Sequence, residues 1–404
     1  MVYFMSAKDY KARVIVELDK MRDRLVEMAE AIHSYNEVGY KEYETSKLLI
    51  TELKRHGFEV TPNVAEMSTA FKAVYRGKEG GIKVAFLSEM DALPGLGHGC
   101  GHNIIGVASV GAGIALSKVI SELNGNVMVF GTPAEEAAVD LAGGKVRMLG
   151  VIKEADVAML VHPSDRNLVT TKNVCREALK FEFRGKAAHA GSSPHLGINA
   201  LDAAMNMFNL VNSLRQHLKS DVRIHGVIVN GGSSPNVVPD YAVVKMYVRA
   251  IEKNYLDETI EKVKNCARGA ALGTGTTVEI SSYAMRYLNI VCNPTLSELF
   301  RMNWESLGLV VDEPPERNYG STDMGNVSQE LPSIHPYVAI APKGTPGHSV
   351  ALREAAKSKT GYDGLIFAAK GLAMTAVDLF TQPLQVRKMR EDFAEFKRGK
   401  SIDY

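Results

Sequence analysis

Residues 83–103 read KVAFLSEMDALPGLGHGCGHN, a short apolar run that ends in a loop rich in glycine. Two further apolar runs, at 126–130 and 158–161, also end in loops, and stretches rich in alanine and glycine separate the three runs. Strands that alternate with helices in this way predict a mostly parallel sheet between helical layers, the α/β class. Ligands of such sheets bind beyond the carboxyl ends of the strands.

The loop that ends this stretch brings a thiol and an imidazole close together. Glycines stand at every second position from 95 to 101, which leaves the backbone free to bend closely around a bound group. Cys100 and His102 project from this loop, and a thiolate with an imidazole suits zinc or another borderline first-row metal. A tight turn with a buried thiol and a hydrogen-bonded histidine explains the same two residues, so this pair alone leaves both interpretations open.

Two adjacent carboxylates follow the second run. Glu135 and Glu136 suit the solvated N-terminus of a helix, which favours negative charge, but adjacent side chains also point in different directions. One carboxylate can then bind a metal while the other accepts a proton from metal-bound water as general base. His162 follows the third run, and His348 lies in a loop rich in glycine and proline. Either histidine alone is typical of a structural residue, whereas the whole set at strand ends indicates a metal centre.

The number of candidate ligands favours two metal ions over one. More candidates are present than one tetrahedral catalytic zinc needs, namely Cys100, His102, Glu136, His162 and His348. Two ions that share a bridging water fit this number better, and such sites hold their ions ~3.5–4 Å apart. Glu135 is then left to take the proton. The residues therefore predict a hydrolase with two divalent ions, zinc first, with manganese, cobalt or nickel as alternatives.

The composition of the 404 residues is that of a globular chain, with 46% hydrophobic and 23% charged residues. Lys and Arg number 47 and Asp and Glu 46, a balance that predicts no binding to nucleic acid or to an anionic membrane. The longest uncharged apolar run, 104–116, is too short to span a bilayer. No apolar segment of a signal peptide opens the chain, and only four cysteines are present. We therefore expect a cytoplasmic protein.

A segment with a different pattern of apolar and polar residues interrupts the part of the chain that is rich in alanine and glycine. Its predicted elements are alternating strands at 179–183 and 241–248 and helices at about 199–218 and 257–272. We therefore expect residues 1–173 and 291–404 to form a discontinuous catalytic domain, with an inserted α+β lid domain at 174–290. Before the first strand, apolar spacing predicts a helix over about 8–32 and another over about 44–55.

Several segments resemble, in this order along the chain, the motifs of one known family. They are an opening helix pair around 32–45, Met90-Asp-Ala-Leu-Pro94, Gly97-His-Gly-Cys-Gly-His-Asn103, Pro133-Ala-Glu-Glu136, Gly185-Lys-Ala-Ala-His-Ala-Gly191 and His348. The family is the aminoacylase/carboxypeptidase G family of di-metal peptidases. The most similar branch holds aminobenzoyl-glutamate hydrolases, indole-acetyl-amino-acid and hippurate hydrolases, and related dipeptidases. The resemblance spans nearly the whole chain.

This resemblance implies roles for the residues of the catalytic domain. The implied metal ligands are Cys100, His102, Glu136, His162 and His348. Glu135 would be the general base, and Asp91 would orient or support the metal site. The wider family has a ligand histidine two residues before that aspartate, where this chain has Glu89, so its site follows the Cys/His variant.

The resemblance also implies roles for the inserted domain, which becomes a lid and dimerisation domain. His189 matches the histidine that stabilises the oxyanion in the active site of the partner subunit. A fixed imidazole donor suits the negative oxygen of a tetrahedral intermediate. Asn236 and Arg249 match positions that hold the substrate carboxylate, which a guanidinium binds well. A homodimer or higher homo-oligomer follows.

The residue after His102 narrows the choice among the members of this branch. Many members have Asp after Cys-Gly-His, whereas Asn103 resembles the aminobenzoyl-glutamate hydrolases and the dipeptidases that act on short basic dipeptides. The implied function is an amidohydrolase that cleaves the amide bond of N-acyl amino acids or dipeptides with a free carboxylate, by metal-activated water with Glu135 as general base. The alternatives are an aminobenzoyl-glutamate hydrolase specifically, a catalytically silent metal-containing peptide-binding protein, or a hydrolase of ureido compounds.

Overall fold

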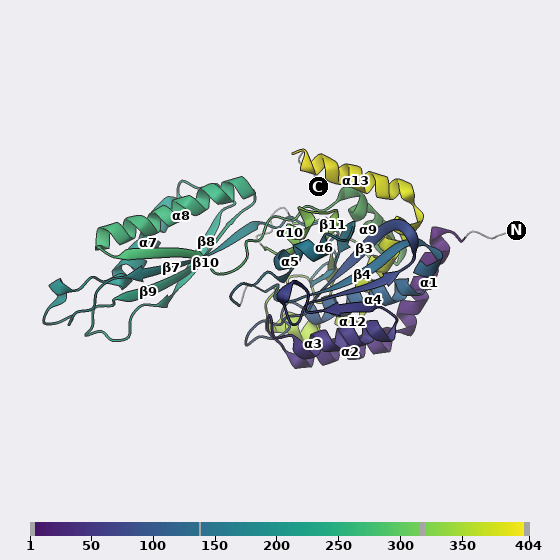
Figure 1. The fold of residues 1–404 in the computed structure, drawn as a ribbon, viewed down its shortest axis with the longest axis horizontal. Coiled ribbons are helices and arrows are strands. Elements are labelled where there is room, and N and C mark those ends of the chain that lie inside the picture. The colour runs from purple at the N-terminus through teal and green to yellow at the C-terminus, as the bar shows by residue number, and fades with distance from the viewer. Residues whose placement is uncertain (1–4, 137–138, 316–319, 400–404) are drawn as a thin grey trace. The chain divides into compact units, whose positions relative to one another are not determined.

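The computed structural model, which describes residues 5–136, 139–315 and 320–399, divides into two units. The first unit comprises the described residues of Met1–Lys172, Ile290–Asn318 and Asp323–Tyr404. The second comprises Asn173–Asn289 with residues 320–322. Each unit has its own hydrophobic core and its own helices and strands (Figure 1).

A six-stranded sheet forms the centre of the first unit, in the order β1-β2-β4-β3-β5-β11. Its strands are β1 (Glu59–Pro62), β2 (Phe71–Arg76), β3 (Lys78–Glu89), β4 (Asn124–Thr132), β5 (Val157–Met159) and β11 (Ser333–Ile334). The four strands from β4 to β11 run parallel, and β1 and β2 are antiparallel additions. A second, two-stranded parallel sheet pairs β6 (His162–Ser164) with β12 (Tyr337–Ala339). The predicted α/β fold with a mostly parallel sheet is confirmed.

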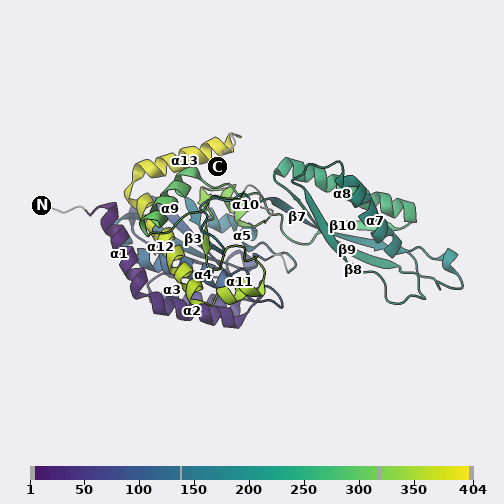
Figure 2. The same ribbon diagram turned by 180° about the vertical axis from the view of Figure 1, so that it is seen from behind.

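Helices cover both faces of this sheet (Figures 1 and 2). The helices of the first unit are α1 (Ala7–Lys20), α2 (Arg22–Tyr35), α3 (Tyr43–Arg55), α4 (His102–Ser117), α5 (Gly144–Arg147), α6 (Leu149–Ile152), α9 (Pro294–Ser306), α10 (Met324–Ser328), α11 (Val350–Ala355), α12 (Lys359–Thr381) and α13 (Pro383–Lys397). In β3, Val84 and Phe86 pack in the core that contains α4 and α12, while Ala85 and Leu87 pack in the core that contains α6 and α10. Successive side chains of a strand point to opposite faces, so both faces of β3 are buried.

Helix α4 begins at His102, one of the predicted ligands, and all of its residues are buried. A Cβ on Gly106 would lie 2.7 Å from the carbonyl oxygen of Glu89, so only glycine permits this approach of α4 to the end of β3. The helix α12 is long and apolar enough to cross a membrane, but 78% of its apolar window is buried inside the protein, as in a core helix.

The predicted helix over 8–32 is wrong in one respect, because two helices meet at Met21. The φ and ψ angles of Met21 are −85° and −4°, which turns the chain between α1 and α2. The two helices have different neighbours, since α1 packs chiefly against α12 and α2 against α4. Apolar positions continue at helical spacing across the turn, for example Leu18 and Leu25, so the spacing conceals it.

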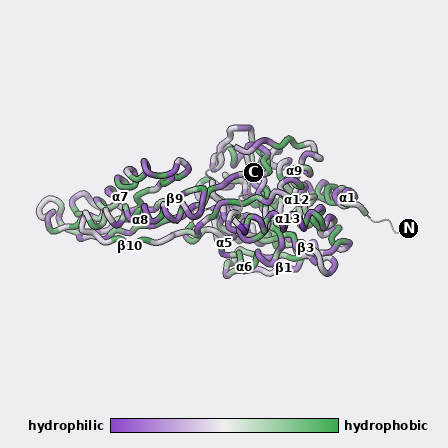
Figure 3. The backbone as a smooth tube through the Cα atoms, turned by 90° about the horizontal axis from the view of Figure 1, so that it is seen from above, coloured by the Kyte–Doolittle hydropathy of each residue, from purple (hydrophilic) through white to green (hydrophobic). Residues whose placement is uncertain are grey.

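The second unit is a four-stranded antiparallel sheet with two helices. Its strands, in the order β10-β7-β9-β8, are β10 (Thr277–Ser282), β7 (Cys175–Arg184), β9 (Tyr241–Ala250) and β8 (Arg223–Asn230). Helices α7 (Ala200–Arg215) and α8 (Lys253–Thr274) pack on one face of the sheet. Strand β8 is an edge strand, and its Val227 and Val229 are exposed; the hydropathy of each segment can be followed in Figure 3.

Candidate metal centre

The turn that separates Cys100 from His102 depends on glycine. Gly101 has φ +80° and precedes the first residue of α4, and a Cβ at this position would lie 2.7 Å from Pro163 Cγ. Only glycine accepts both this backbone conformation and this contact. As a result, Cys100 Sγ lies 3.2 Å from Nε2 of His162, the first residue of β6.

Asp91 fixes the orientation of the residues around it. Its buried carboxylate accepts hydrogen bonds from His102 Nδ1 at 3.2 Å and from the backbone N–H groups of Glu135 and Glu136 at 3.1 and 2.9 Å. Burial opposes protonation of His102, but the hydrogen bonds to Asp91 and Cys100, together with the charges of Glu89 and Asp91, outweigh it and raise the pKa of His102 well above its ordinary value. Asp91 therefore holds both the imidazole and the pair of glutamates, and leaves His102 Nε2 free for another partner.

A second buried carboxylate supports the glutamate loop from the other side. Glu42 accepts hydrogen bonds from the backbone N–H of Ala134 at 2.9 Å and from the hydroxyl of Thr69 at 2.7 Å. Ala134 has φ +53°, a left-handed conformation that is costly for alanine and that these contacts maintain. Burial, with the nearby charge of Asp91, raises the pKa of Glu42 to about 7.

The predicted ligands meet in groups that share members. Among the described residues, three groups around the predicted ligands have their ligand atoms within 4.8 Å of one another. They are Cys100, His102 and His162; Cys100, Glu136 and His348; and His102, Glu135 and Glu136. His348, whose Nε2 lies 3.4 Å from Glu136 Oε1, is brought to the centre by a backbone hydrogen bond from its N–H to the carbonyl of Gly99.

The donor atoms of these groups fit divalent metal ions. His102 Nε2 and Glu136 Oε1 are buried without a hydrogen-bond partner in the described part of the chain. His162 donates its Nδ1–H to the carbonyl of Pro163 at 2.7 Å, which leaves the lone pair on Nε2. Burial lowers the pKa of His162 to about 4, so the ring is in the neutral form that binds metals. Thiol, imidazole and carboxylate together suit zinc and its first-row neighbours.

The second unit holds the other three predicted site residues and brings two of them, His189 and Asn236, close together. His189 is exposed, and its Nδ1 accepts hydrogen bonds from the N–H groups of Gly191 and Ser192, so the neutral ring carries its proton on Nε2. The loop of Asn236 lies beside it, since Ala190 N–H donates to the Asn236 carbonyl at 2.9 Å.

Arg249 lies at the other end of the sheet. It pairs across the strands with Arg176, near the start of β7, whereas His189 follows the end of β7. The length of strand between them is on the order of 25 Å, at about 3.3 Å per residue. Arg249 is half-buried, and its Nη1 donates to the hydroxyl of Ser321 at 3.0 Å.

Two residues beside the candidate metal centre, Lys145 and Asp323, received no role from the sequence. Lys145 is buried and forms ion pairs with Glu89 and Asp323. The sequence offered little signal for Lys145 or Asp323, since neither charge directly follows a predicted strand or stands at a metal-binding spacing. Asn103, which narrowed the branch, is also buried, and its amide donates to the carbonyls of Ala29 and Ala356. It therefore joins helices in this structure.

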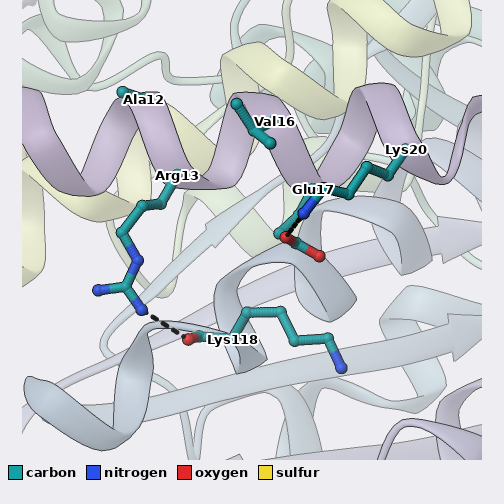
Figure 4. A pocket seen from close by; sticks show the side chains of 6 residues that line it. All are labelled: Ala12, Arg13, Val16, Glu17, Lys20 and Lys118. Atoms are coloured by element: carbon teal, nitrogen blue, oxygen red, sulfur yellow. Dashed lines mark hydrogen bonds and ion pairs between the residues drawn. The ribbon is translucent and has the colours of Figure 1, made fainter.

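A surface pocket on α1 lies apart from these residues. It has a volume of about 420 Å³ and is lined by Ala12, Arg13, Val16, Glu17, Lys20 and Lys118 (Figure 4). Arg13 donates to the carbonyl of Lys118 at 3.2 Å, and Lys20 pairs with Glu17 at 2.8 Å. None of the predicted site residues lines this pocket.

Comparison with known proteins relates both units to metallopeptidases. Residues 170–274 match the family described as a peptidase dimerisation domain. The chain is 36% identical to a mouse Xaa-Arg dipeptidase over 401 residues, which cover 95% of this chain and 92% of that protein. It is 30% identical to one of the chains of the p-aminobenzoyl-glutamate hydrolase of Escherichia coli (strain K12), with 89% of each chain covered.

Solved structures share the fold. A putative aminohydrolase from methicillin-resistant Staphylococcus aureus superposes with a TM-score of 0.75 at 22% identity, covering 92% of this chain and all of that one. A dinuclear metal-binding peptidase from Bacillus subtilis superposes with a TM-score of 0.66 at 21% identity, covering 90% of this chain and 99% of that one.

Proposed function

Because the chain belongs to the M20 family of metal-dependent peptidases and amidohydrolases, we propose that it hydrolyses the amide bond of N-acyl amino acids or dipeptides that carry a free carboxylate. The observation that carries this proposal is the convergence of the predicted ligands, with Glu135 beside them. The two relatives named above are, by their names, a dipeptidase and an aminobenzoyl-glutamate hydrolase, both of which release an amino acid from an amide.

We propose two divalent metal ions as cofactors, with zinc first and manganese, cobalt or nickel as alternatives. Cys100, His102 and His162 form one group of ligands, and Glu136 and His348, again with Cys100, form the other. When bound, such ions polarise the carbonyl of the substrate and lower the pKa of water.

Glu135 is the proposed general base. Its backbone N–H donates a hydrogen bond to Asp91, which fixes the position of the residue. Its Oε2 lies 3.9 Å from Nε2 of His102, one of the proposed ligands. A carboxylate held at this place can take the proton of the attacking water and return it to the leaving amine. Asp91 and Glu42 contribute by holding the loop, and neither needs to touch the substrate.

The lid residues require a second copy of the chain. We propose that His189 stabilises the oxyanion through Nε2–H and that Arg249 and Asn236 bind the substrate carboxylate. The carboxylate and the scissile carbonyl of a dipeptide are only a few bonds apart, whereas His189 and Arg249 of one chain are separated by the length of β7. Asn236 lies beside His189, so one substrate can use all three residues only if His189 and Asn236 come from a partner subunit and Arg249 from the other chain. The exposed edge strand β8, with Val227 and Val229, is suited to pairing with a second copy.

The remaining proposals concern location and other partners. We propose a cytoplasmic enzyme whose partners are its small amide substrate and its own copies, without nucleic acid or membrane. The four cysteines are free thiols, which suits a reducing compartment. The balanced charge of +1 supports the absence of an anionic partner.

The test is a measurement of metal content followed by hydrolysis of a substrate panel. The panel contains aminobenzoyl-glutamate, acetyl-amino acids, a carbamoyl amino acid and dipeptides that end in Lys, Arg, Glu or Leu. We expect about two metal ions per chain and cleavage of at least one amide that a chelator abolishes. Full metal occupancy without cleavage of any amide would refute the hydrolase and leave the peptide-binding protein.

A further inference from the structure

A buried lysine lies beside the metal centre, and no step of the proposed function uses it. Lys145 stands in α5, and its side chain is 0% exposed. Its Nζ lies 2.6 Å from Glu89 Oε1 and 2.5 Å from Asp323 Oδ1, and its backbone N–H donates to Asp323 Oδ2 at 2.9 Å. The ammonium therefore joins three segments: the end of β3, the helix α5 and the residue before α10.

The carboxylates around this lysine form a group that would otherwise suit a metal ion. Ligand oxygens of Glu89, Glu135 and Asp323 lie within 4.8 Å of one another, and all three residues are buried. Buried carboxylates without a counter-charge are strongly unfavourable, so a cation has to balance them. Carboxylate oxygens are the usual ligands of hard divalent ions. Here the Nζ of Lys145 already contacts two of the three carboxylates.

We infer that Lys145 is a built-in cation that takes the place of a metal ion between Glu89 and Asp323 and positions Glu89 beside His102. Glu89 Oε2 lies 3.4 Å from His102 Nε2, the nitrogen that the bond of Nδ1 to Asp91 leaves free. With Glu89 anchored by the ammonium, divalent ions are directed to the groups that contain Cys100. The inference rests on the proposed function only for the identity of those groups.

The charge state of the lysine agrees with this role. Burial opposes its protonation, but the charges of Asp323 and Glu89 outweigh burial and raise the pKa of Lys145 above its ordinary value. The ammonium is thus a permanent cation. A chelator, which removes divalent ions, leaves this one in place, so Lys145 should hold β3, α5 and Asp323 together in the metal-free protein.

The experiment measures metal content and the thermal unfolding of the metal-stripped protein, and neither needs turnover. We compare the full-length wild type, Lys145→Met and the triple variant K145M/E89Q/D323N. Lys153→Met is the matched control, because Lys153 is 50% exposed and pairs with Glu330 on the surface at 2.8 Å. We expect two ions per wild-type chain and a fall of roughly 10 °C in the unfolding midpoint of stripped K145M. The neutral triple variant should recover most of this fall, and K153M should match the wild type.

Two results would overturn the inference. If metal-stripped K145M had the same unfolding midpoint as the stripped wild type, the ammonium would not hold β3, α5 and Asp323 together. A wild type with three ions per chain, one of which is lost in Asp323→Asn, would place a metal where we place the lysine. The number of ions bound by the wild type and by Asp323→Asn tests the inference even if K145M does not fold. Since both readouts are independent of catalysis, failure of the protein to cleave any amide would leave the result intact.

Discussion

Asp91→Asn separates support of the metal centre from ligation of the metal. In the structure both carboxylate oxygens of Asp91 are used, Oδ1 by His102 and Glu135 and Oδ2 by the N–H of Glu136. Asparagine has the same shape but only one acceptor oxygen. Whichever way the amide is turned, its NH2 group faces a backbone or ring N–H that it cannot satisfy.

The magnitude follows from the number of donors that lose their acceptor. If the amide oxygen stays at Oδ1, the new NH2 group and the N–H of Glu136 are both left buried and unpaired. Each costs about 1–3 kcal/mol, so the metal-free variant should lose about 2–6 kcal/mol of unfolding free energy. The loop of Glu136 and the ring of His102 also lose their fixed orientation, and loss of such outer contacts typically lowers metal affinity 10–100-fold.

The assay is a competition between the protein and a chelating dye, with denaturant unfolding of the stripped protein beside it. Asp19→Asn is the control, because Asp19 is exposed and pairs with Lys370 on the surface. Asp91→Asn should bind metal more weakly and unfold earlier, while Asp19→Asn should do neither. Wild-type metal affinity together with wild-type stability in Asp91→Asn would refute the supporting role.

Three further predictions concern the metal ions and the two catalytic residues. A chelator should abolish turnover and lower the unfolding midpoint, and added zinc or manganese should restore both; turnover that survives complete metal removal would contradict the proposed chemistry. Glu135→Gln should keep two ions, as metal analysis can show, and lose about 10²–10⁴-fold in kcat, whereas near-normal kcat would exclude Glu135 as general base. His189→Ala and Glu135→Gln should each be inactive alone, yet random mixing of the two should restore about a quarter of wild-type activity, because half of the dimers are mixed and one of their two sites is intact. A mixture that stays inactive despite exchange of subunits would place His189 in its own active site.

The sequence predicted the sheet better than the helix boundaries, for a physical reason. The second half of strand β3 is buried on both faces, with Phe86 on one side and Leu87 on the other, so residues 84–87 have to be apolar. A run of this kind is visible in the sequence. The turn at Met21 lacks glycine and proline, and the helices on either side of it keep the same apolar spacing. The boundary between α1 and α2 depends on how these helices pack against α12 and α4, so the local sequence does not reveal it.

The same distinction applies to the candidate site. Cys100, Glu136 and His162 were found because they follow strands, and parallel strands end at one edge of the sheet. Asp323 and Lys145 are 178 residues apart, and their meeting depends on how α5 and α10 pack. No spacing in the sequence encodes such a pair, so a buried ion pair of this kind becomes visible only in three dimensions.

The charges at the metal centre explain why a lysine is needed there. Six negative charges are present when the thiolate of Cys100 and five buried carboxylates are ionised, and those carboxylates are Glu89, Asp91, Glu135, Glu136 and Asp323. Two divalent ions supply four positive charges, and the Lys145 ammonium supplies a fifth. One negative charge then remains. A general base needs such a charge to accept a proton, and Glu135 is the carboxylate that we propose for this role. Without Lys145 the excess would double in a site from which water is largely excluded, and a carboxylate would have to be protonated before the reaction begins.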